Sequence, residues 1–235
     1  MLKRPERTTF FEQIAERLQE ISAIRVLELG SGPGFLARHL RDSIPGLQLT
    51  LLDFSPAMHE LARARLGAGA LGVDFVTRSF RDDDWTAGLP RFDAVVTMQA
   101  VHELRHKRHA VALHAAVKAV LRSGGEYLVC DHFAGEGGIQ HTELYMTAEE
   151  QALAVCSASF LEVERVIQLG TLVLHRARSA SDRDARVFTD EDRELEAAGL
   201  TEYAASLPDE DCAAMIEPDA FEAVRWVPGK GWVEP

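Results

Sequence analysis

A glycine-rich turn at residues 30–34 constrains this chain more than any other feature. It follows an apolar run at residues 24–29 and precedes an apolar run at 35–40, so the order reads strand, tight turn, helix. Glycine lets the backbone approach a ligand closely, and the free N–H groups of the following helix face the same space. The turn therefore predicts a ligand-binding loop.

The spacing of the glycines limits which ligand the loop accepts. The dinucleotide fingerprint is G-x-G-x-x-G, whereas this turn runs G-x-G-x-G, and Phe35 stands in the place of the third glycine. The acidic Glu28 lies two residues before the turn. Its carboxylate repels a pyrophosphate and attracts an ammonium group, which disfavours the alternative of a nicotinamide-dependent dehydrogenase.

The stretch at residues 26–34, V-L-E-L-G-S-G-P-G, resembles the first motif of class I S-adenosylmethionine-dependent methyltransferases. The resemblance continues through roughly residues 24–177. It implies that Glu28 holds the amino group of the cofactor, directly or through water. It also implies that the turn lies under the methionine part of the cofactor, with contacts from Gly30, Ser31, Gly32 and Gly34. A generic strand-to-helix turn of another α/β protein is the alternative.

Strand and helix patterns alternate after residue 24, which predicts an α/β fold with helices on both faces of a mostly parallel sheet. The expected strands are 24–29, 48–52, 73–77, 93–98 and 126–131, and the expected helices are 35–42, 56–66 and 105–121. Two further apolar runs, 161–168 and 171–177, predict a final antiparallel hairpin. The resemblance implies a Rossmann-like, seven-stranded sheet of order 3-2-1-4-5-7-6.

Three regions are expected along the chain. Residues 1–23 carry a helical pattern at 10–21, interpreted either as a lid over the cofactor pocket or as a helix packed permanently against the sheet. Residues 24–178 form the S-adenosylmethionine-binding methyltransferase domain. Residues 179–235 form an acidic C-terminal extension, with a linker, a helix at about 189–198, and Trp226 and Trp232 to anchor the tail. A loosely ordered tail is the alternative.

The net charge of −12 is unevenly distributed. From Ser179 onward there are 15 Asp and Glu against 5 Lys and Arg, which leaves −2 for the preceding residues. Because phosphate contacts need Lys and Arg, this balance disfavours a nucleic-acid or membrane partner. It favours a small-molecule or protein acceptor. A homodimer formed through the C-terminal extension is a further expectation.

The cysteines and the N-terminus point to a cytoplasmic protein. Cys130, Cys156 and Cys212 are odd in number and far apart, which suits free thiols better than disulfides or a zinc site. The basic N-terminus has no apolar segment behind it, so we expect no secretory signal. No apolar run is long enough to predict a membrane span.

Further cofactor contacts are expected at the ends of the next strands. Asp53 ends the second strand, where an acidic residue accepts hydrogen bonds from ribose hydroxyls, and the resemblance implies the same role. Phe54 and Met58 are candidates to flank the adenine, with ordinary core packing as the alternative. The family's aspartate near the third strand is missing, which leaves Ser79 and Phe80, or Asp82, for the adenine. Met98 and Gln99 complete the expected cofactor contacts.

His102 follows the fourth strand and is the candidate catalytic residue. Many small-molecule methyltransferases carry a histidine pair here, and Glu103 replaces the second member. The unperturbed pKa of histidine suits a general base, and a histidine that only bonds a neighbouring loop is the alternative. A metal site at His102 and His106 is disfavoured, because a third ligand is missing. The candidate acceptor contacts are Asp131, His132, His141 and Tyr145.

These residues predict a methyltransferase that moves the methyl group of S-adenosylmethionine to a small-molecule acceptor by direct displacement. The product is S-adenosylhomocysteine, and no metal is expected. A protein that binds S-adenosylmethionine without methylating, as a sensor or for other chemistry, is the alternative.

Overall fold

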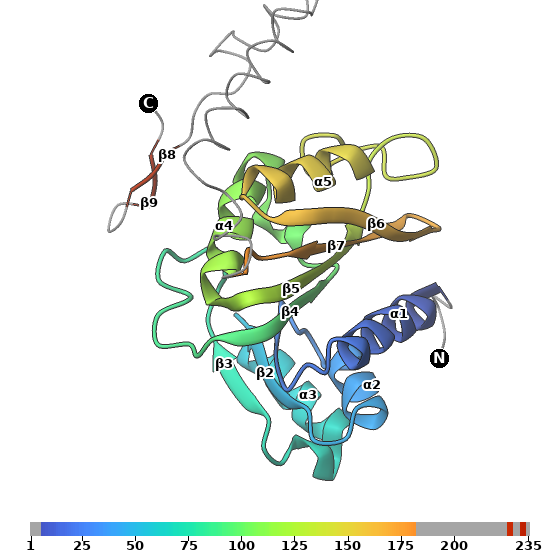
Figure 1. Cartoon of the computed structure of the whole chain (residues 1–235), viewed down its shortest axis with the longest axis vertical. Helices are drawn as coiled ribbons and strands as arrows, with labels where there is room; N and C mark the ends of the chain where they lie inside the picture. The colour runs from blue at the N-terminus through green and yellow to red at the C-terminus, as the bar shows by residue number, and fades with distance from the viewer. Residues whose placement is uncertain (1–5, 182–224, 228–230, 234–235) are drawn as a thin grey trace, which may run out of the picture. The chain divides into compact units, whose positions relative to one another are not determined.

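The computed structural model describes residues 6–181, 225–227 and 231–233. The chain divides into two compact units, Met1–Ser179 and Ala180–Pro235. The first unit contains a seven-stranded sheet with helices on both faces (Figure 1).

The strands of this sheet are β1 (Arg25–Leu29), β2 (Gln48–Asp53), β3 (Asp74–Thr77), β4 (Phe92–Met98), β5 (Leu121–His132), β6 (Leu161–Leu169) and β7 (Leu172–Arg178). The α-helices are α1 (Glu6–Glu20), α2 (Phe35–Ser43), α3 (Pro56–Leu66), α4 (Ala110–Val120) and α5 (Ala148–Ser157). Short 3-10 turns cover Gly67–Ala70, Val101–Leu104 and Lys107–His109.

The strand order is β3-β2-β1-β4-β5-β7-β6, which confirms the expected order. Strands β1 to β5 pair in parallel, and β7 runs antiparallel to both β5 and β6. The final hairpin is therefore confirmed as well. Parallel strands place their carboxyl ends at one edge, and the order reverses between β1 and β4, where α/β sheets bind ligands.

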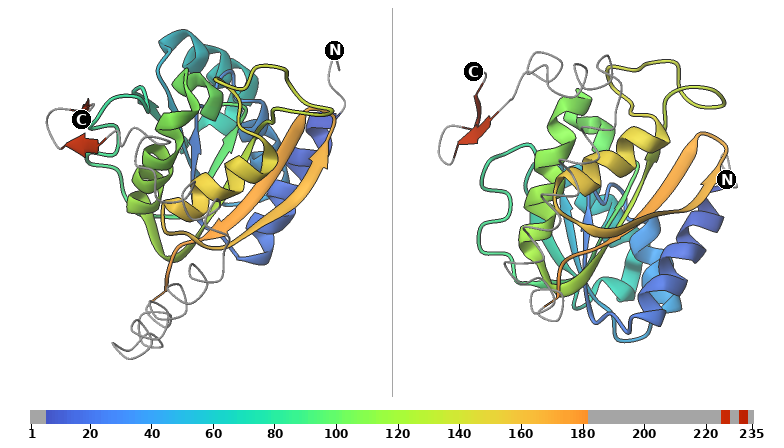
Figure 2. Two further views of the ribbon diagram at one scale, coloured as in Figure 1. Left: turned by 90° about the horizontal axis from the view of Figure 1, so that it is seen from above. Right: turned by 45° about the horizontal axis from the view of Figure 1, so that its top comes forward.

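Each face of the sheet is covered by its own group of helices (Figures 1 and 2). Helices α1, α2 and α3 pack on one face and share a core cluster with alternate residues of the central strands. Helices α4 and α5 pack on the other face around a second cluster. This arrangement follows from near-continuous apolar strands, which must be buried on both sides.

Helix α1 belongs to the first core. Phe10, Ile14 and Leu18 are fully buried in it. Arg17 Nε donates to the buried carboxylate of Glu126 on β5 at 2.8 Å, and a second guanidinium nitrogen of Arg17 donates to the other oxygen. These contacts favour the interpretation of α1 as a helix packed against the sheet rather than a detachable lid.

Two expected boundaries are wrong between residues 101 and 125. The expected helix 105–121 begins only at Ala110, because Arg105 adopts a left-handed φ of 67° that ends the preceding 3-10 turn. The strand expected at 126–131 is β5, which already begins at Leu121. Leu121 pairs with Phe92, and the register then shifts, so Gly124 and Gly125 lie in an irregular part of the strand rather than before it.

Helix α5 was not expected from the sequence. It begins with a capping box, in which the Thr147 hydroxyl accepts from Glu150 N at 3.1 Å and Glu150 Oε2 accepts from Thr147 N at 2.8 Å. The T-x-x-E spacing is a helix-start signal that can be recognised in the sequence alone. From this helix, Gln151 Nε2 donates to His132 O at 2.8 Å and to Met146 O at 3.4 Å, at the two ends of the loop of residues 133–147.

Strand β6 forms one edge of the sheet. Its pairing with β7 shifts register twice, between Leu161 and Glu164 and between Arg165 and Ile167. Glu162 has a φ of 52° in the first irregular stretch. Charged and apolar side chains are mixed along this strand, and most of its residues are exposed.

The second unit contributes one described feature. β8 (Arg225–Val227) and β9 (Gly231–Val233) form an antiparallel pair with Trp226 opposite Trp232. The expected helix at 189–198, Cys212, the anchoring role of the two tryptophan side chains and the expected dimer contact lie outside the described residues. Among the described helices, none combines the length and apolar character needed to cross a membrane.

Replacing Gly34 by alanine should destabilise the fold. Gly34 has a φ of 74°, and an added Cβ would lie 2.9 Å from Ala62 Cβ on α3. Strain and overpacking together should lower the free energy of unfolding by about 2–4 kcal/mol, measured by urea titration. Gly46→Ala is the matched control: its φ is 83°, and a Cβ there meets nothing within 4 Å. Equal losses in the two variants would contradict the packing argument.

Candidate cofactor site and acceptor crevice

The glycine turn lies at the carboxyl end of β1. Gly30, Gly32 and Gly34 all have positive φ, at 70°, 52° and 74°. The N–H groups of Gly30 and Ser31 donate to Leu52 O at 2.9 and 3.0 Å, which ties the turn to β2. A Cβ on Gly32 would meet nothing within 4 Å. The bare backbone at Gly32 therefore borders open space, as a ligand-binding turn requires.

Glu28 is the buried acid of the site. It is 2% exposed, and its Oε2 has no hydrogen-bond partner. The pKa of Glu28 is raised to about 8, because burial and the nearby charge of Asp53 outweigh the opposing hydrogen bond from the Ala37 backbone. An unpartnered carboxylate at this depth is suited to a cationic donor.

Three more buried oxygens near the turn lack partners. They are Ser31 Oγ, Thr97 Oγ1 and Gln99 Oε1. Thr97 pairs with Leu29, and its side chain lies on the opposite face of the sheet from Glu28. A ligand at the glycine turn that is rich in N–H and O–H donors would satisfy the oxygens of Ser31 and Gln99. The ammonium and ribose groups of S-adenosylmethionine therefore fit the residues present.

Asp53 closes the site on the β2 side. Its Oδ2 accepts from Gly32 N at 2.7 Å and its Oδ1 from Ser55 N at 2.9 Å. Each carboxylate oxygen keeps a further lone pair, so Asp53 can also accept from ribose hydroxyls. It is 6% exposed and lies directly beside the glycine turn, where the sequence predicted it.

The residues expected at the adenine differ in exposure and in their contacts. Phe54 is 69% exposed and Met58 is half-buried. Ser79 Oγ accepts from Arg81 N at 3.1 Å and so belongs to a local turn, which Asp82 also joins. The Phe80 ring comes within 3.5 Å of a Cβ built on Gly30. Met98 is half-buried against the first core.

His102 is held by Asp131. Its Nδ1–H donates to Asp131 Oδ1 at 2.7 Å, and its backbone N–H donates to Asp131 Oδ2 at 2.8 Å. Burial lowers the pKa of His102, but the hydrogen bond and charge of Asp131 outweigh burial and raise it above its usual value. Nε2 lies 3.6 Å from Glu103 Oε1. Fixing Nδ1 as the protonated nitrogen makes Nε2 the proton-accepting one.

The role of Asp131 was missed at the sequence level, where it was only a candidate acceptor contact. The signal was available: β4 and β5 are parallel neighbours, so residues following both strands meet. Met98 pairs with Cys130, which places the segment after residue 98 beside Asp131. Asp131 is 4% exposed, and both of its carboxylate oxygens accept hydrogen bonds from His102, so it orients the imidazole.

A second polar chain lies beside this pair. Gln99 Nε2 donates to His132 Nε2 at 2.7 Å, and His132 Nδ1 donates to Thr171 Oγ1 at 2.8 Å. The ring of Tyr145, from the loop before α5, lies 5.2 Å from the His102 ring and 5.8 Å from the His132 ring. His141 instead accepts from Leu144 N within that loop, at 3.2 Å.

Two observations concern other kinds of site. Among the described residues, no three His, Cys, Asp or Glu side chains gather as metal ligands.

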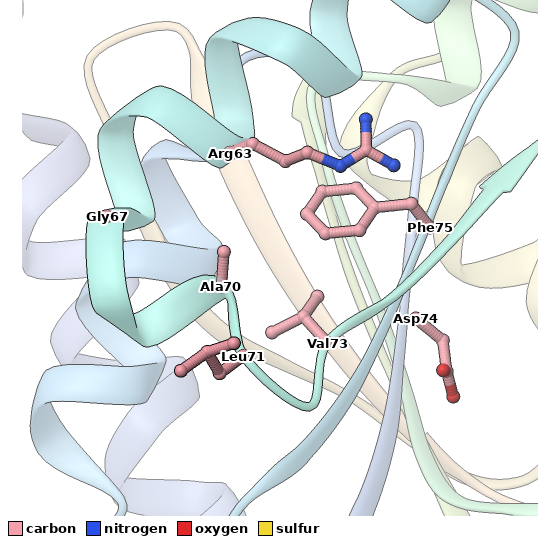
Figure 3. A pocket seen from close by; sticks show the side chains of 7 residues that line it. All are labelled: Arg63, Gly67, Ala70, Leu71, Val73, Asp74 and Phe75. Atoms are coloured by element: carbon pink, nitrogen blue, oxygen red, sulfur yellow. The ribbon is translucent and has the colours of Figure 1, made fainter.

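A hollow of about 370 Å³ lies at the amino end of β3, away from the glycine turn (Figure 3). In this hollow the Arg63 guanidinium stacks on the Phe75 ring, 4.0 Å from the ring centroid. None of the residues expected to bind the cofactor lines it.

Comparison with known proteins gives the same assignment. Residues 26–125 match the family described as "Methyltransferase domain". The chain is 35% identical over 79 residues to a release factor glutamine methyltransferase of Deinococcus radiodurans. It is 37% identical over 92 residues to a trans-aconitate 2-methyltransferase of Mycobacterium tuberculosis. These matches cover 34% and 39% of this chain but only 28% and 32% of those proteins.

A solved structure shares the fold. Human N-acetylserotonin methyltransferase in complex with S-adenosylmethionine superposes with a TM-score of 0.57 and 18% identity, over 75% of this chain and 56% of that one. The family match, the order of the seven strands and the glycine turn all indicate the same kind of domain. Residues 26–125 therefore carry a methyltransferase domain, and the sheet around them has the fold of the class I S-adenosylmethionine-dependent methyltransferases.

Proposed function

We propose that this protein transfers a methyl group from S-adenosylmethionine to a small-molecule acceptor, with His102 as the general base. The observation that carries the proposal is the His102–Asp131 pair, which lies at the sheet edge that also carries the glycine turn. When bound, S-adenosylmethionine supplies an electrophilic methyl group on a sulfonium sulfur. The protein's part is to hold both partners in line and to take the acceptor's proton.

Each expected residue has a definite task in this proposal. Glu28 and the glycine turn hold the amino-acid end of the cofactor, and Asp53 holds its ribose. His102 Nε2 accepts the proton of the acceptor, and Asp131 stabilises the imidazolium that results. The acidic chain and the similarity to a protein named for trans-aconitate both support a small acceptor.

The test is formation of S-adenosylhomocysteine. The full chain is incubated with S-adenosylmethionine and a panel of hydroxyl, carboxyl, amine and thiol compounds, and the product is measured by mass spectrometry. Acceptor-dependent product with a methylated acceptor supports the proposal. Cofactor binding without product across the panel would favour the alternative of a binding protein.

Replacing Asp53 by alanine should weaken cofactor binding about tenfold or more, because hydrogen bonds to a charged group are lost. Calorimetric titration with S-adenosylhomocysteine measures this. Asp53→Asn is the matched variant, since it keeps acceptors for Gly32 N or Ser55 N but removes the charge. Wild-type affinity in Asp53→Ala would remove Asp53 from the site.

A further inference from the structure

We propose that the hollow at the amino end of β3 is an effector site for a small organic monoanion, a carboxylate carried on a compact apolar body. The site is separate from the cofactor site, and its occupation changes the affinity for the cofactor. Three features support this inference: the open volume, the charge that faces it, and a chain of contacts that leads to Asp53.

The hollow has room for a small molecule. Its volume of about 370 Å³ falls within the range of about 300–1,000 Å³ that is typical of ligand sites. It lies between the end of α3, the 3-10 turn Gly67–Ala70 and the first residues of β3 (Figure 3). The apolar part of its lining consists of Ala70, Leu71, Val73 and Phe75. Leu71 is 79% exposed, so an apolar ligand body would remove this surface from water.

Arg63 supplies the charge that faces the hollow. Its side chain and the Phe75 ring are directed toward each other, whereas the Asp74 carboxylate points away from both (Figure 3). None of the ion pairs among the described residues involves Arg63. Its guanidinium N–H groups are therefore available to a ligand carboxylate, which they match in geometry.

The same charges limit the ligand to one negative charge. A single guanidinium balances one carboxylate, and Asp74 also lines the hollow. A second negative charge on the ligand would therefore lack a cation and meet Asp74. The stack on Phe75 holds the plane of the guanidinium, so little side-chain freedom is lost when the carboxylate binds.

A chain of contacts connects the hollow with the cofactor site. The His59 ring meets the edge of the Phe75 ring, with centroids 5.4 Å apart and an interplanar angle of 69°. His59 is 2% exposed, and its Nε2 donates to Asp53 O at 3.2 Å. The Asp53 carboxylate in turn accepts from Gly32 N at 2.7 Å. The chain thus runs from Arg63 to the glycine turn.

This chain gives the expected sign of the effect. A ligand body on Phe75 restrains that ring, and with it His59 and the backbone of Asp53. The cofactor also needs Asp53 in place, so each ligand lowers the ordering cost of the other. Because such coupling is reciprocal, a bound carboxylate should increase cofactor affinity. This step rests on the proposed role of Asp53 at the ribose, whereas the binding step does not.

Matched probes test the binding step. Calorimetry of the full chain, saturated with S-adenosylhomocysteine, compares 2-naphthoate with 2-naphthamide, which has the same rings and no charge. We expect naphthoate to bind about fivefold more tightly or better, because it gains a charge-assisted bond to Arg63. Arg63→Gln should remove this difference. Arg165→Gln, on the opposite edge strand β6, is the matched control and should keep it.

Two more variants locate the site and the coupling. Ala70→Phe puts a ring into the hollow and should abolish binding of both probes. In the wild type, saturating naphthoate should strengthen binding of S-adenosylhomocysteine by about twofold or more. His59→Phe removes the contact with Asp53 O, so naphthoate should still bind but should no longer change cofactor affinity.

The contrary outcomes are distinct. Equal affinities for the two probes, unchanged naphthoate binding in Ala70→Phe, or equal losses in Arg63→Gln and Arg165→Gln would overturn the assignment of the site. Naphthoate binding that leaves the affinity for S-adenosylhomocysteine unchanged would overturn its role as an effector site. Neither measurement uses methyl transfer, so a chain that passes both and methylates no acceptor contradicts the proposed function alone. Circular dichroism of each variant checks that the fold is retained.

Discussion

Replacing His102 by alanine is expected to lower turnover about 10²–10⁴-fold, the usual contribution of a positioned general base. Affinity for S-adenosylhomocysteine should stay within about twofold of wild type, because none of the proposed cofactor contacts is removed. Steady-state kinetics and calorimetry on the same preparations measure the two effects. Wild-type turnover in this variant at every pH would show that His102 is not the base.

Asp131→Asn refines this prediction through its pH dependence. The groups that face His102 are Asp131, Glu103, His132 and Tyr145, and Asp131 contributes the hydrogen bond and charge that raise the His102 pKa. Turnover should therefore rise with pH as His102 loses its proton. Without the Asp131 charge, the midpoint should move to lower pH and the plateau should fall. A reduced plateau with an unmoved midpoint would contradict this role of Asp131.

Replacing Glu28 by glutamine should stabilise the cofactor-free protein and weaken cofactor binding at the same time. The folded-state pKa of Glu28 is about 8, above its ordinary value of 4.5. Between these values the folded chain keeps a proton that the unfolded chain releases, so wild-type stability falls as pH rises. The slope approaches about 1.4 kcal/mol per pH unit. Glu28→Gln removes this loss, so its advantage should be larger at pH 8 than at pH 5.

Urea titrations of both proteins at pH 5, 7 and 8 measure this difference. Two buried histidines also change the free energy of unfolding at low pH. Burial lowers the pKa of His114 to about 3 and that of His175 to about 4. They lower stability as pH falls below about 6.5, but they do so equally in both proteins, so the difference between the variants isolates Glu28. A difference that does not change with pH would contradict the proposed burial cost.

The same variant tests the cofactor contact. An ammonium group favours the ionised Glu28, so wild-type affinity for S-adenosylhomocysteine should increase with pH toward 8. Glu28→Gln should lose tenfold or more in affinity at pH 8, because its amide carries no charge. Calorimetry in buffers of different ionisation enthalpy would also detect the proton released on binding. Equal affinities would separate Glu28 from the amino group.

The sequence predicted the sheet because its signals are local. Apolar strands, the glycine turn and the final hairpin each depend on neighbouring residues, and the structure contains all of them. The strand order was implied by the family resemblance rather than by periodicity, and the structure confirms it. The start of α4 was mispredicted because Arg105 adopts a left-handed conformation that no periodicity reveals. Helix α5 was missed although Thr147 and Glu150 carry a capping signal.

The contacts within the candidate site were harder to predict from the sequence than the sheet. Glu28 and Asp53 lie at the carboxyl ends of β1 and β2, so their positions could be inferred from the strand pattern. The contact of His102 with Asp131 joins residues 29 positions apart, and Tyr145 reaches both histidine rings from a loop without a recognisable motif. Such contacts depend on strand pairing and on how the loop folds back, which the sequence alone does not state.

The irregular course of β6 has a consequence for the chain in crowded solution. An open sheet margin is a template onto which another polypeptide can add its own strand. Two register shifts and the acidic Glu162 and Glu164 spoil the regular spacing of amide and carbonyl groups that such addition needs. These features disfavour the addition of strands from other chains at the β6 edge, although the strand is long and bears apolar residues.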